Sequence, residues 1–375
     1  MQLKDPIHGI IEIDDQDILE LIQTNAFQRL THIKQQGHTY LLHPNALHTR
    51  IEHSLGVYEL IKRLIIHLLG KRDVQFTPYE IKVAKIAALL HDIGHGPFSH
   101  CFQTISGQDH GDWTIRIVED TQEIITILNR TPNLLQDVLL VLRGEGAFPI
   151  IEELLFGSLS MDQMDFWNRD LFYSNIDMDP INMNNFIATM SYTENKLVIS
   201  IDGIPYVEKL MDIKRALYEK GFGHPFVVGK DLLLKEIFKE VKNENVQLQS
   251  SNLSKCISSD EQDIKVLEYL SLNDETIQNE IEYLKTYDNE FIQQLAHLYL
   301  SVNESLPWAE IDIEHQQMDG HTVVAVMKEK KNYSSYSGGV FIEQGSELVD
   351  IATLSSHVHS SFLRPAKQYI YFLKS

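Results

Sequence analysis

Residues 89–100, with the sequence LLHDIGHGPFSH, concentrate side chains that can bind a metal ion or move a proton. An apolar helix is predicted to end at the adjacent His91 and Asp92. A Gly-His-Gly-Pro turn that contains His95 follows, and His100 comes shortly after it. Burying a histidine and an aspartate together is costly unless a partner compensates them. Imidazole and carboxylate together suit borderline divalent ions. The alternative is a helix end whose histidines stabilise its negative dipole, but the number of histidines and glycines here favours a metal site.

A second predicted helix brings another histidine toward the same point. It begins near Ala46 and carries RIEHSLGV at residues 50–57, with His53 at the border of its apolar stripe. Taken alone, such a histidine is more often a core-edge side chain bonded to a backbone carbonyl. The sequence TPYE at residues 77–80 is a capping box with proline at the first helical position, and it starts the helix that ends near His91. Two apolar helices therefore each present a histidine, which favours His53 as a further metal ligand.

The stretch SMDQMDFWNRD at residues 160–170 is the second dense cluster. Asp162, Asp165 and Arg169 fall at i, i+3 and i+7, on one face of a predicted helix. A solvated acidic face is one interpretation. The large apolar residues interleaved with these charges are more typical of the wall of a pocket.

Most other segments have helical patterns, so we predict a mainly α fold with a small β-rich appendage. The polar, serine-rich residues 243–260 are the segment we expect to be flexible. Strand-like composition appears late in the chain, at 322–327, 339–343 and 369–373. We therefore expect a helical domain over 1–240, a helical extension over 241–309 and a small β-rich region over 310–375.

Composition limits the classes of function. The chain has 375 residues, 43% apolar and 23% charged, as ordinary soluble globular proteins have. Its 53 acidic and 32 basic residues give a net charge of −21, which makes nucleic acid an unlikely main ligand but allows a local basic pocket. The sequence has no apolar run of membrane-spanning length and no signal-peptide core near Met1. With only Cys101 and Cys256, we expect a reducing compartment, the cytoplasm, and no membrane association.

The motifs together resemble the HD-domain metal-dependent phosphohydrolase superfamily, and specifically its dNTP triphosphohydrolase-like branch. Order and spacing agree over residues 1–240, which the resemblance identifies as an HD-domain helical bundle. It also implies a homo-oligomer, a dimer or larger. The matching stretches are DPIHG at 5–9, FQRL at 27–30, RIEHSLGV at 50–57, HDIGHGPFSH at 91–100 and MDFWNRD at 164–170.

The resemblance also implies roles for individual residues. One divalent metal ion, whose identity stays open among Mn, Fe, Ni, Zn and Mg, would be held by His53, His91, Asp92 and Asp162. Three catalytic histidines would face the phosphates, where histidine can bond an oxygen or move a proton: His95, His100 and His110. The substrate would be bound by Arg50 at a phosphate, by Gln35 near the nucleoside and by Asp170 at the sugar hydroxyl.

Several positions depart from the family pattern. Gly111 stands where a glutamate is usual, although Asp112 could substitute from the next position. Gln103 replaces a frequent aspartate, so we expect the loss of a group that orients a histidine. Phe166 replaces a tyrosine and cannot bond the sugar hydroxyl, and Thr31 replaces an arginine of some relatives. These changes leave the implied metal ligands intact and bear on the substrate.

Three functions therefore remain open. The first is hydrolysis of a deoxynucleoside triphosphate to deoxynucleoside and tripolyphosphate. The second is hydrolysis of another nucleotide or small phosphoester. The third is a catalytically weak nucleotide-binding protein with a regulatory or scaffold role.

Overall fold

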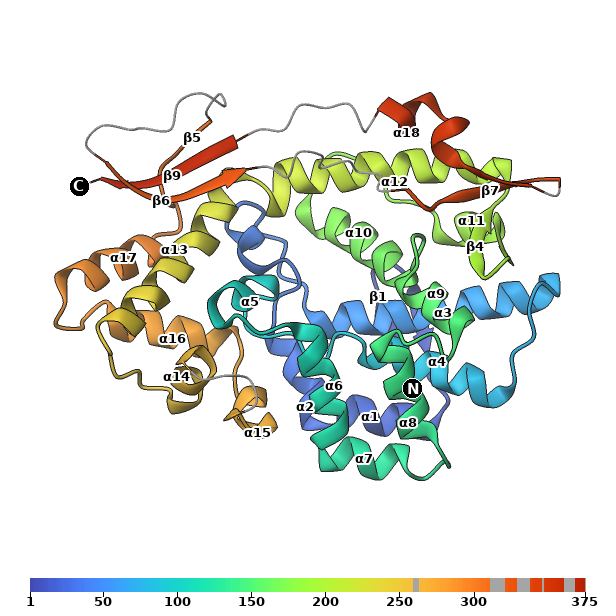
Figure 1. Ribbon diagram of the computed structural model, residues 1–375, viewed down its shortest axis with the longest axis horizontal. Coiled ribbons are helices and arrows are strands. Elements are labelled where there is room, and N and C mark those ends of the chain that lie inside the picture. The colour runs from blue at the N-terminus through green and yellow to red at the C-terminus, as the bar shows by residue number, and fades with distance from the viewer. Residues whose placement is uncertain (259–262, 311–320, 329–337, 346, 361–367, 375) are drawn as a thin grey trace.

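The computed structural model describes residues 1–258, 263–310, 321–328, 338–345, 347–360 and 368–374. The predicted mainly α fold is confirmed, and several small sheets accompany the helices (Figure 1). Within the described ranges, no helix is both long and apolar enough to cross a membrane.

The central helices form one apolar core. Helix α3 (Arg50–Lys71) packs against α4 (Pro78–Leu90) and α10 (Met161–Ser174), and α4 also contacts α8 (Leu134–Arg143), which packs on α6 (His110–Asp120). Their inward faces carry fully buried aliphatic side chains such as Leu60, Leu64 and Leu89. Burial of this apolar surface is the main stabilising contribution to the bundle. The predicted capping box at residues 77–80 starts α4 as expected.

Further helices surround this core, and short 3-10 and π turns connect some of them. The helices are α1 (Gln16–Gln23), α2 (Asn25–Gln28), α5 (His100–Ser106), α7 (Gln122–Leu128), α9 (Pro149–Phe156), α11 (Met183–Ala188), α12 (Ile204–Leu217), α13 (Pro225–Asn243), α14 (Ser251–Ser258), α15 (Val266–Leu270), α16 (Asp274–Leu284), α17 (Glu290–Leu300) and α18 (Ser356–Ser360). The 3-10 turns span Arg29–His32, Gly37–Leu41, Ile201–Gly203 and Ile351–Thr353, and the π turn spans Tyr218–Phe222.

Two predicted features differ from the structure. Helix α3 begins at Arg50 and not near Ala46, because the backbone of the preceding residues bonds to an earlier segment: the Gln35 amide donates to the His48 carbonyl at 3.0 Å. The stretch 243–260, predicted to be flexible, contains α14 instead. Leu253 and other apolar side chains of that helix are buried, which offsets the polar composition of the stretch. Residues 259 and 260 lie outside the described ranges.

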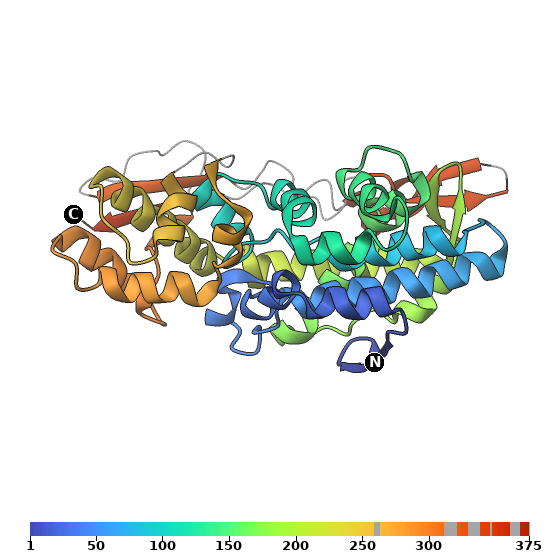
Figure 2. The ribbon, with the colours of Figure 1, turned by 90° about the horizontal axis from the view of Figure 1, so that it is seen from below.

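The strands form three small sheets. An antiparallel hairpin of β1 (Gln2–Asp5) and β2 (Gly9–Glu12) lies at the N-terminus and extends away from the helical layer in Figure 2. A four-stranded sheet has the order β3 (Met190–Thr193), β4 (Lys196–Ile199), β7 (Phe341–Gln344) and β8 (Glu347–Asp350). A three-stranded sheet has the order β5 (Trp308–Glu310), β9 (Gln368–Lys374) and β6 (His321–Lys328).

One sheet joins distant parts of the chain. Strand β4 pairs in parallel with β7, with Val198 opposite Phe341 and Ile199 opposite Ile342. This sheet therefore combines strands of the predicted helical domain with strands of the predicted β-rich region. The boundaries at 240 and 309 stay a prediction.

Candidate functional site

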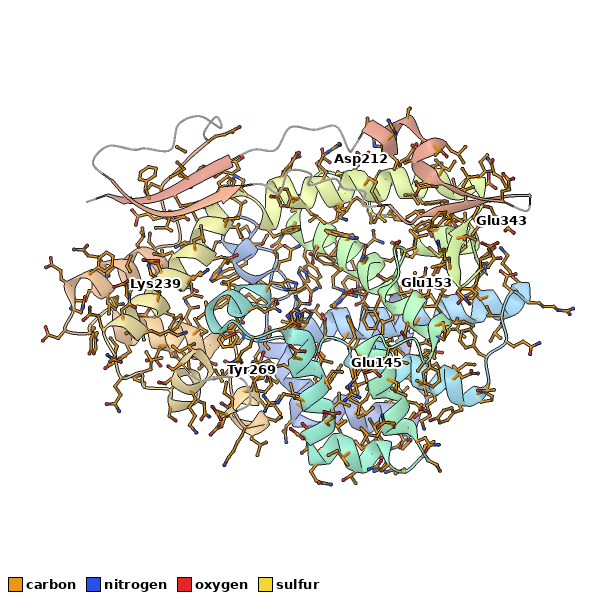
Figure 3. All side chains as sticks on the ribbon, viewed as in Figure 1. Glu145, Glu153, Asp212, Lys239, Tyr269 and Glu343 are labelled. Atoms are coloured by element: carbon orange, nitrogen blue, oxygen red, sulfur yellow. The ribbon has the colours of Figure 1, made fainter. Side chains whose placement is uncertain are left out.

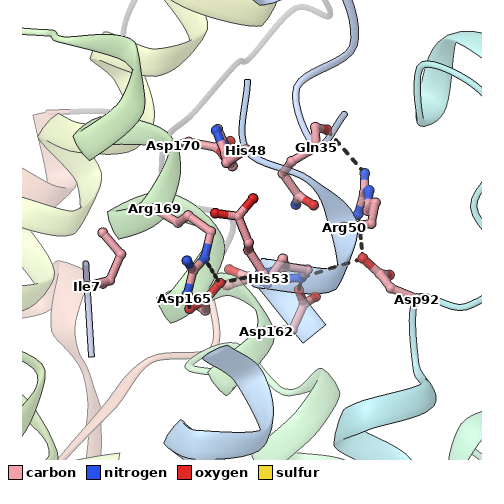
Figure 4. Close-up of polar contacts among 12 residues, drawn as sticks. Ile7, Gln35, His48, Arg50, His53, Asp92, Asp162, Asp165, Arg169 and Asp170 are labelled. Atoms are coloured by element: carbon pink, nitrogen blue, oxygen red, sulfur yellow. Dashed lines mark hydrogen bonds and ion pairs between the residues drawn. The ribbon is translucent and has the colours of Figure 1, made fainter. Parts of the chain in front are cut away.

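Four side chains predicted as metal ligands converge on one point, and Figure 4 shows three of them, His53, Asp92 and Asp162. His53 comes from the first turn of α3 and Asp162 from the first turn of α10, and their Nε2 and Oδ1 atoms lie 3.1 Å apart. The Nε2 atom of His91 lies 3.5 Å from a carboxylate oxygen of both Asp92 and Asp162. Because α4 ends at Leu90, His91 and Asp92 lie on a turn, which lets two adjacent residues face the same point.

The hydrogen bonds of the two histidines suit a metal ion. His91 Nδ1 lies 2.9 Å from the Ala88 carbonyl, and His53 Nδ1 lies 2.8 Å from the Asp165 carboxylate. Both partners only accept, so each Nδ1 carries a proton, and each ring presents a lone pair at Nε2 once it is neutral. These two Nε2 atoms are buried and face the carboxylate oxygens of Asp92 and Asp162 at distances of 3.1 to 3.5 Å. Two such nitrogens beside two carboxylates form a donor set for a divalent ion.

The electrostatics of the cluster also favour a cation. In the metal-free protein, burial lowers the pKa of His53, but the contacts with Asp162 and Asp165 outweigh burial and raise it to about 10. Burial raises the pKa of Asp162, but the hydrogen bonds with His53 and His91 hold that pKa well below its usual value. The carboxylates thus favour positive charge on His53, at the point where a bound metal ion would otherwise provide it.

A buried ionic network orients His53. Asp165 accepts from His53 Nδ1, and its other oxygen lies 2.6 Å from His8 Nε2. Arg169 donates to both oxygens of Asp165, at 2.9 and 2.8 Å, and to Asp5 at 2.8 Å. The sequence placed Asp165 and Arg169 on one helix face without assigning them to His53. The DPIHG motif includes His8, but its role was not predicted, because its contact with Asp165 spans 157 residues.

The three predicted catalytic histidines form a second cluster beside the first. The rings of His95 and His110 stack with centroids 4.0 Å apart, and His100 meets both rings edge-on. His95 Nε2 lies 3.4 Å from Asp92 Oδ1, so this cluster adjoins the candidate metal ligands. Burial lowers the pKa of all three histidines and the charge of Arg50 lowers it further, so neutral rings are expected near pH 7.

Two expectations about the departures are corrected here. Gln103 was expected to leave a histidine without an orienting group, but its amide lies 2.7 Å from His100 Nδ1 and 2.9 Å from His110 Nδ1. Asp112, considered as a substitute acid, is exposed on the first turn of α6. The carboxylate near His110 belongs instead to Asp109, the N-cap of that helix, because the cap residue lies on the side of Gln103.

The residues predicted to bind substrate lie close by. Arg50 is buried, forms an ion pair with Asp92 and donates from Nε to Ser99 Oγ at 2.9 Å. Asp170 uses one carboxylate oxygen to bind His48 Nε2 at 2.8 Å. Its other oxygen and the side-chain oxygen of Gln35 are buried acceptors without a partner in the described part of the chain.

One cavity of about 540 Å³ connects these groups. Its wall includes Lys214, whose pKa burial lowers and whose ammonium lies 5.5 Å from the centre of the Trp167 ring. Lys214 and Asp231 were not found from the sequence, because they come from α12 and α13, outside the recognised motifs. Eight of the ten predicted site residues line the cavity: Gln35, Arg50, Asp92, His95, His100, His110, Asp162 and Asp170.

Residues from later helices hold the loop that connects the candidate metal ligands to the histidine cluster. Phe98 and Ser99 have positive φ angles of 53° and 56°, a strained conformation for residues with side chains. Asp274 accepts from the Phe98 amide at 2.6 Å, and the Tyr269 hydroxyl donates to the Gly94 carbonyl at 2.7 Å. Figure 3 shows Tyr269 beside α6. Helices after residue 260 therefore stabilise a turn that positions the histidines.

Comparison with known proteins identifies the class. Residues 50–141 match the HD domain family model, so the chain contains an HD domain and the predicted resemblance is confirmed. The matched segment begins at Arg50 and includes three of the four candidate metal ligands, His53, His91 and Asp92.

Particular relatives extend this result. The chain is 33% identical to the uncharacterized protein YwfO of Bacillus subtilis over 240 residues, 64% of this chain and 55% of that protein. It is 48% identical over 101 residues to the deoxynucleoside triphosphate triphosphohydrolase SAMHD1 of Bos taurus, 27% of this chain and 17% of that protein. A crystal structure of a phosphohydrolase from Bacteroides thetaiotaomicron has the same fold over 100% of both chains, with a TM-score of 0.88 and 22% identity. The chain thus spans little more than half the length of its B. subtilis relative.

Proposed function

We propose that this protein is a metal-dependent phosphohydrolase that converts a deoxynucleoside triphosphate to deoxynucleoside and tripolyphosphate. The observation that carries the proposal is the cavity, in which a candidate metal centre, a histidine cluster and two cationic side chains share one wall with unpartnered acceptors. Its volume is within the range of small-molecule sites. The HD domain and the similarity to a triphosphohydrolase support the same reaction class.

The phosphates would lie between the metal centre and the cationic side chains Arg50 and Lys214. These two groups add positive charge to a cavity that is also lined by four carboxylates, and the acidic net charge of the chain favours a small anion over a polyanionic polymer. We propose a single divalent ion, one of Mn, Fe, Ni, Zn or Mg, held by His53, His91, Asp92 and Asp162. When bound, such an ion supplies positive charge for phosphate and lowers the pKa of water. The neutral histidines would bond phosphate oxygens and the reacting water.

The nucleoside would occupy the remainder of the cavity. The free oxygens of Gln35 and Asp170 can only accept, so they suit a hydroxyl donor such as that of a sugar. Phe166 and Trp167, with ring centroids 4.2 Å apart, offer an aromatic wall for a base. Phe166 adds no hydrogen bond, so recognition of the sugar would rest on Gln35 and Asp170.

A different phosphorylated substrate is the second candidate, and Asp231 favours it. This partly exposed carboxylate lines the cavity and binds His38 Nδ1 at 2.5 Å. A ligand beside it must carry a donor group or lose affinity through charge repulsion. Amino-bearing bases satisfy this requirement, and so do other phosphoesters with a cationic group.

We further propose a homo-oligomer in the cytoplasm. The similarity to the triphosphohydrolase branch supports this assembly, and the presence of only two cysteines supports the location. Light scattering coupled to size-exclusion chromatography measures the assembly directly, and a monomer mass would contradict it.

Turnover of the four dNTPs, with Mn²⁺ and separately with Mg²⁺, tests the reaction, with products resolved by anion exchange. We expect deoxynucleoside and tripolyphosphate, lost in Asp162→Ala and retained in the neighbouring control Gln163→Ala. Release of orthophosphate, or turnover of another phosphoester far above every dNTP, would support the second candidate. Absence of turnover on every substrate would favour the binding role.

A further inference from the structure

We propose that Gln103 fixes opposite tautomers on two histidines of the cavity, so that His100 presents a proton-free Nε2 and His110 presents an Nε2–H donor. The tautomers follow from the geometry around the amide. The roles that they would have in phosphate chemistry rest on the proposed function.

The orientation of the Gln103 amide is set by Asp109. The two ends of an amide have the same shape, so their assignment must come from the partners. The end assigned as Nε2 lies 3.0 Å from Asp109 Oδ2, and an ionised carboxylate can only accept. Asp109 also caps α6, where its other oxygen, Oδ1, accepts from the Gly111 amide at 2.7 Å. A reversed amide would place two acceptor oxygens against each other.

The orientation of the amide then determines the tautomers of His100 and His110. Its NH₂ group lies 2.9 Å from His110 Nδ1 and can only donate, so this Nδ1 is bare and the ring proton is on Nε2. Its oxygen lies 2.7 Å from His100 Nδ1 and can only accept, so this Nδ1 carries the proton and Nε2 is bare. Burial lowers the pKa of both histidines, which agrees with neutral rings.

Opposite tautomers give the histidines different roles. His110 can donate a hydrogen bond to a phosphate oxygen, but it cannot release that proton without becoming an imidazolate. His100 can accept a proton from water at Nε2 and become an imidazolium, while its Nδ1–H continues to donate to Gln103. The position of Gln103 on α5, one turn after His100, allows it to reach both rings.

A carboxylate at position 103 would remove this distinction. It would accept from both Nδ1 atoms, so both histidines would carry Nδ1–H and present a bare Nε2. In this chain, Gln103, oriented by Asp109, therefore gives the two histidines different tautomers. Gln103 is a positioning residue that does not itself contact the reacting atoms.

Two-bond ¹H–¹⁵N correlation spectra of the full-length, Mg²⁺-loaded protein test the inference, because they distinguish protonated from bare ring nitrogens. Signals are assigned with His100→Gln and His110→Gln. We expect Nδ1–H for His100 and Nε2–H for His110 in the native chain. In Gln103→Glu, His110 should change to Nδ1–H, while Gln122→Glu, the same charge change on an exposed site of α7, should leave both tautomers unaltered.

The inference is overturned if both histidines have the same tautomer in the native chain, or if His110 does not change in Gln103→Glu. Asp109→Asn provides a second test that keeps the amide. It removes the acceptor that orients the amide, so each histidine should show a mixture of tautomers, and unchanged spectra would count against the inference.

The spectra need no turnover, so this result is separate from the fate of the proposed function. If dNTPs are hydrolysed, Gln103→Glu should reduce kcat/KM by about tenfold or more, because a donor to phosphate is lost. Hydrolysis with identical tautomers would refute the inference alone. The expected tautomers without hydrolysis of any phosphoester would refute the proposed function alone.

Discussion

Asp165 contacts His53 on the ring nitrogen opposite the candidate metal centre. It is fully buried, which raises its pKa, but the charge of Arg169 and the hydrogen bonds from His53, His8 and Arg169 together outweigh burial and hold the pKa of Asp165 well below its usual value. A charged acceptor at this place fixes the ring orientation of His53 and makes its Nε2 a better donor to a metal. We therefore expect Asp165 and its partners to support the candidate metal centre without supplying a ligand to it.

Replacing this carboxylate should weaken metal binding. In Asp165→Asn we expect Mn²⁺ affinity to fall by about 10- to 100-fold, as for other partners of ligating histidines. A chelator-competition titration measures it, at a temperature where circular dichroism shows a folded variant. Asp5→Asn is the matched control, because Asp5 binds the same Arg169 but does not touch His53. An equal loss of Mn²⁺ affinity in both variants would show that Asp165 has only a structural role.

Metal uptake should also depend on pH. The pKa of His53 is about 10 in the metal-free protein, so near neutral pH a proton must leave before Nε2 can bind a cation. Affinity should therefore rise as pH increases toward 10, with release of about one proton or more per ion. Calorimetry in buffers of different ionisation enthalpy counts these protons. An affinity that stays constant from about pH 6.5 to about pH 8.5 would contradict the expected charge state.

At the scale of elements, the close approach of α3 and α10 depends on Gly56. A Cβ at this position would lie 1.9 Å from Asp165 Oδ1 and 2.4 Å from Arg169 Nη2. The absence of a side chain thus allows the ionic network to lie directly on α3, where it reaches His53 one turn earlier.

Alanine substitutions on α3 test this packing. Gly56→Ala should destabilise the fold by about 2 kcal/mol or more, because the added methyl overpacks a buried ion pair. Gly70→Ala lies on the same helix, where a Cβ would have no described atom within 4 Å, and should be neutral or stabilise by up to about 1 kcal/mol. Urea unfolding provides both values. Similar changes in unfolding free energy at the two positions would show that helix propensity, and not the contact with Asp165, determines the effect of the substitution.

At the scale of the molecule, the late strands are packed into the rest of the chain. Val198 and Ile199 of β4 are buried and pair with Phe341 and Ile342 of β7. The same molecule-wide packing appears near the cavity, where Asp274 holds the loop at Phe98. These contacts indicate that the histidine clusters and the outer regions share one cooperative structure.

Truncation tests this view and the predicted boundary at residue 309. A chain of residues 1–309 would expose the edge of β4 and its apolar side chains, so we expect a melting temperature lower by about 5 °C or more, or aggregation. Differential scanning fluorimetry and size-exclusion chromatography measure these outcomes. An unchanged melting temperature would instead show that residues 310–375 form an independent unit.

The sequence by itself determined the features that depend on neighbouring residues. The capping box at 77–80 and the turn after His91 and Asp92 follow from local preferences, because a helix end is satisfied by side chains within about one turn. The motif set also led to the HD domain and to a group of residues that meet at one cavity. Their individual roles stay predictions.

Only the tertiary structure decided the contacts between distant segments. The start of α3 at Arg50, the bond of Asp165 to His8, the place of Lys214 in the cavity and the pairing of β4 with β7 all depend on how elements approach one another in space. Gln103 is near its partners in sequence, but its contacts with His100 and His110 became visible only from the geometry of the turn between α5 and α6. Hydrogen bonds and packing act over a few ångströms, so sequence spacing cannot specify them once elements fold back on each other.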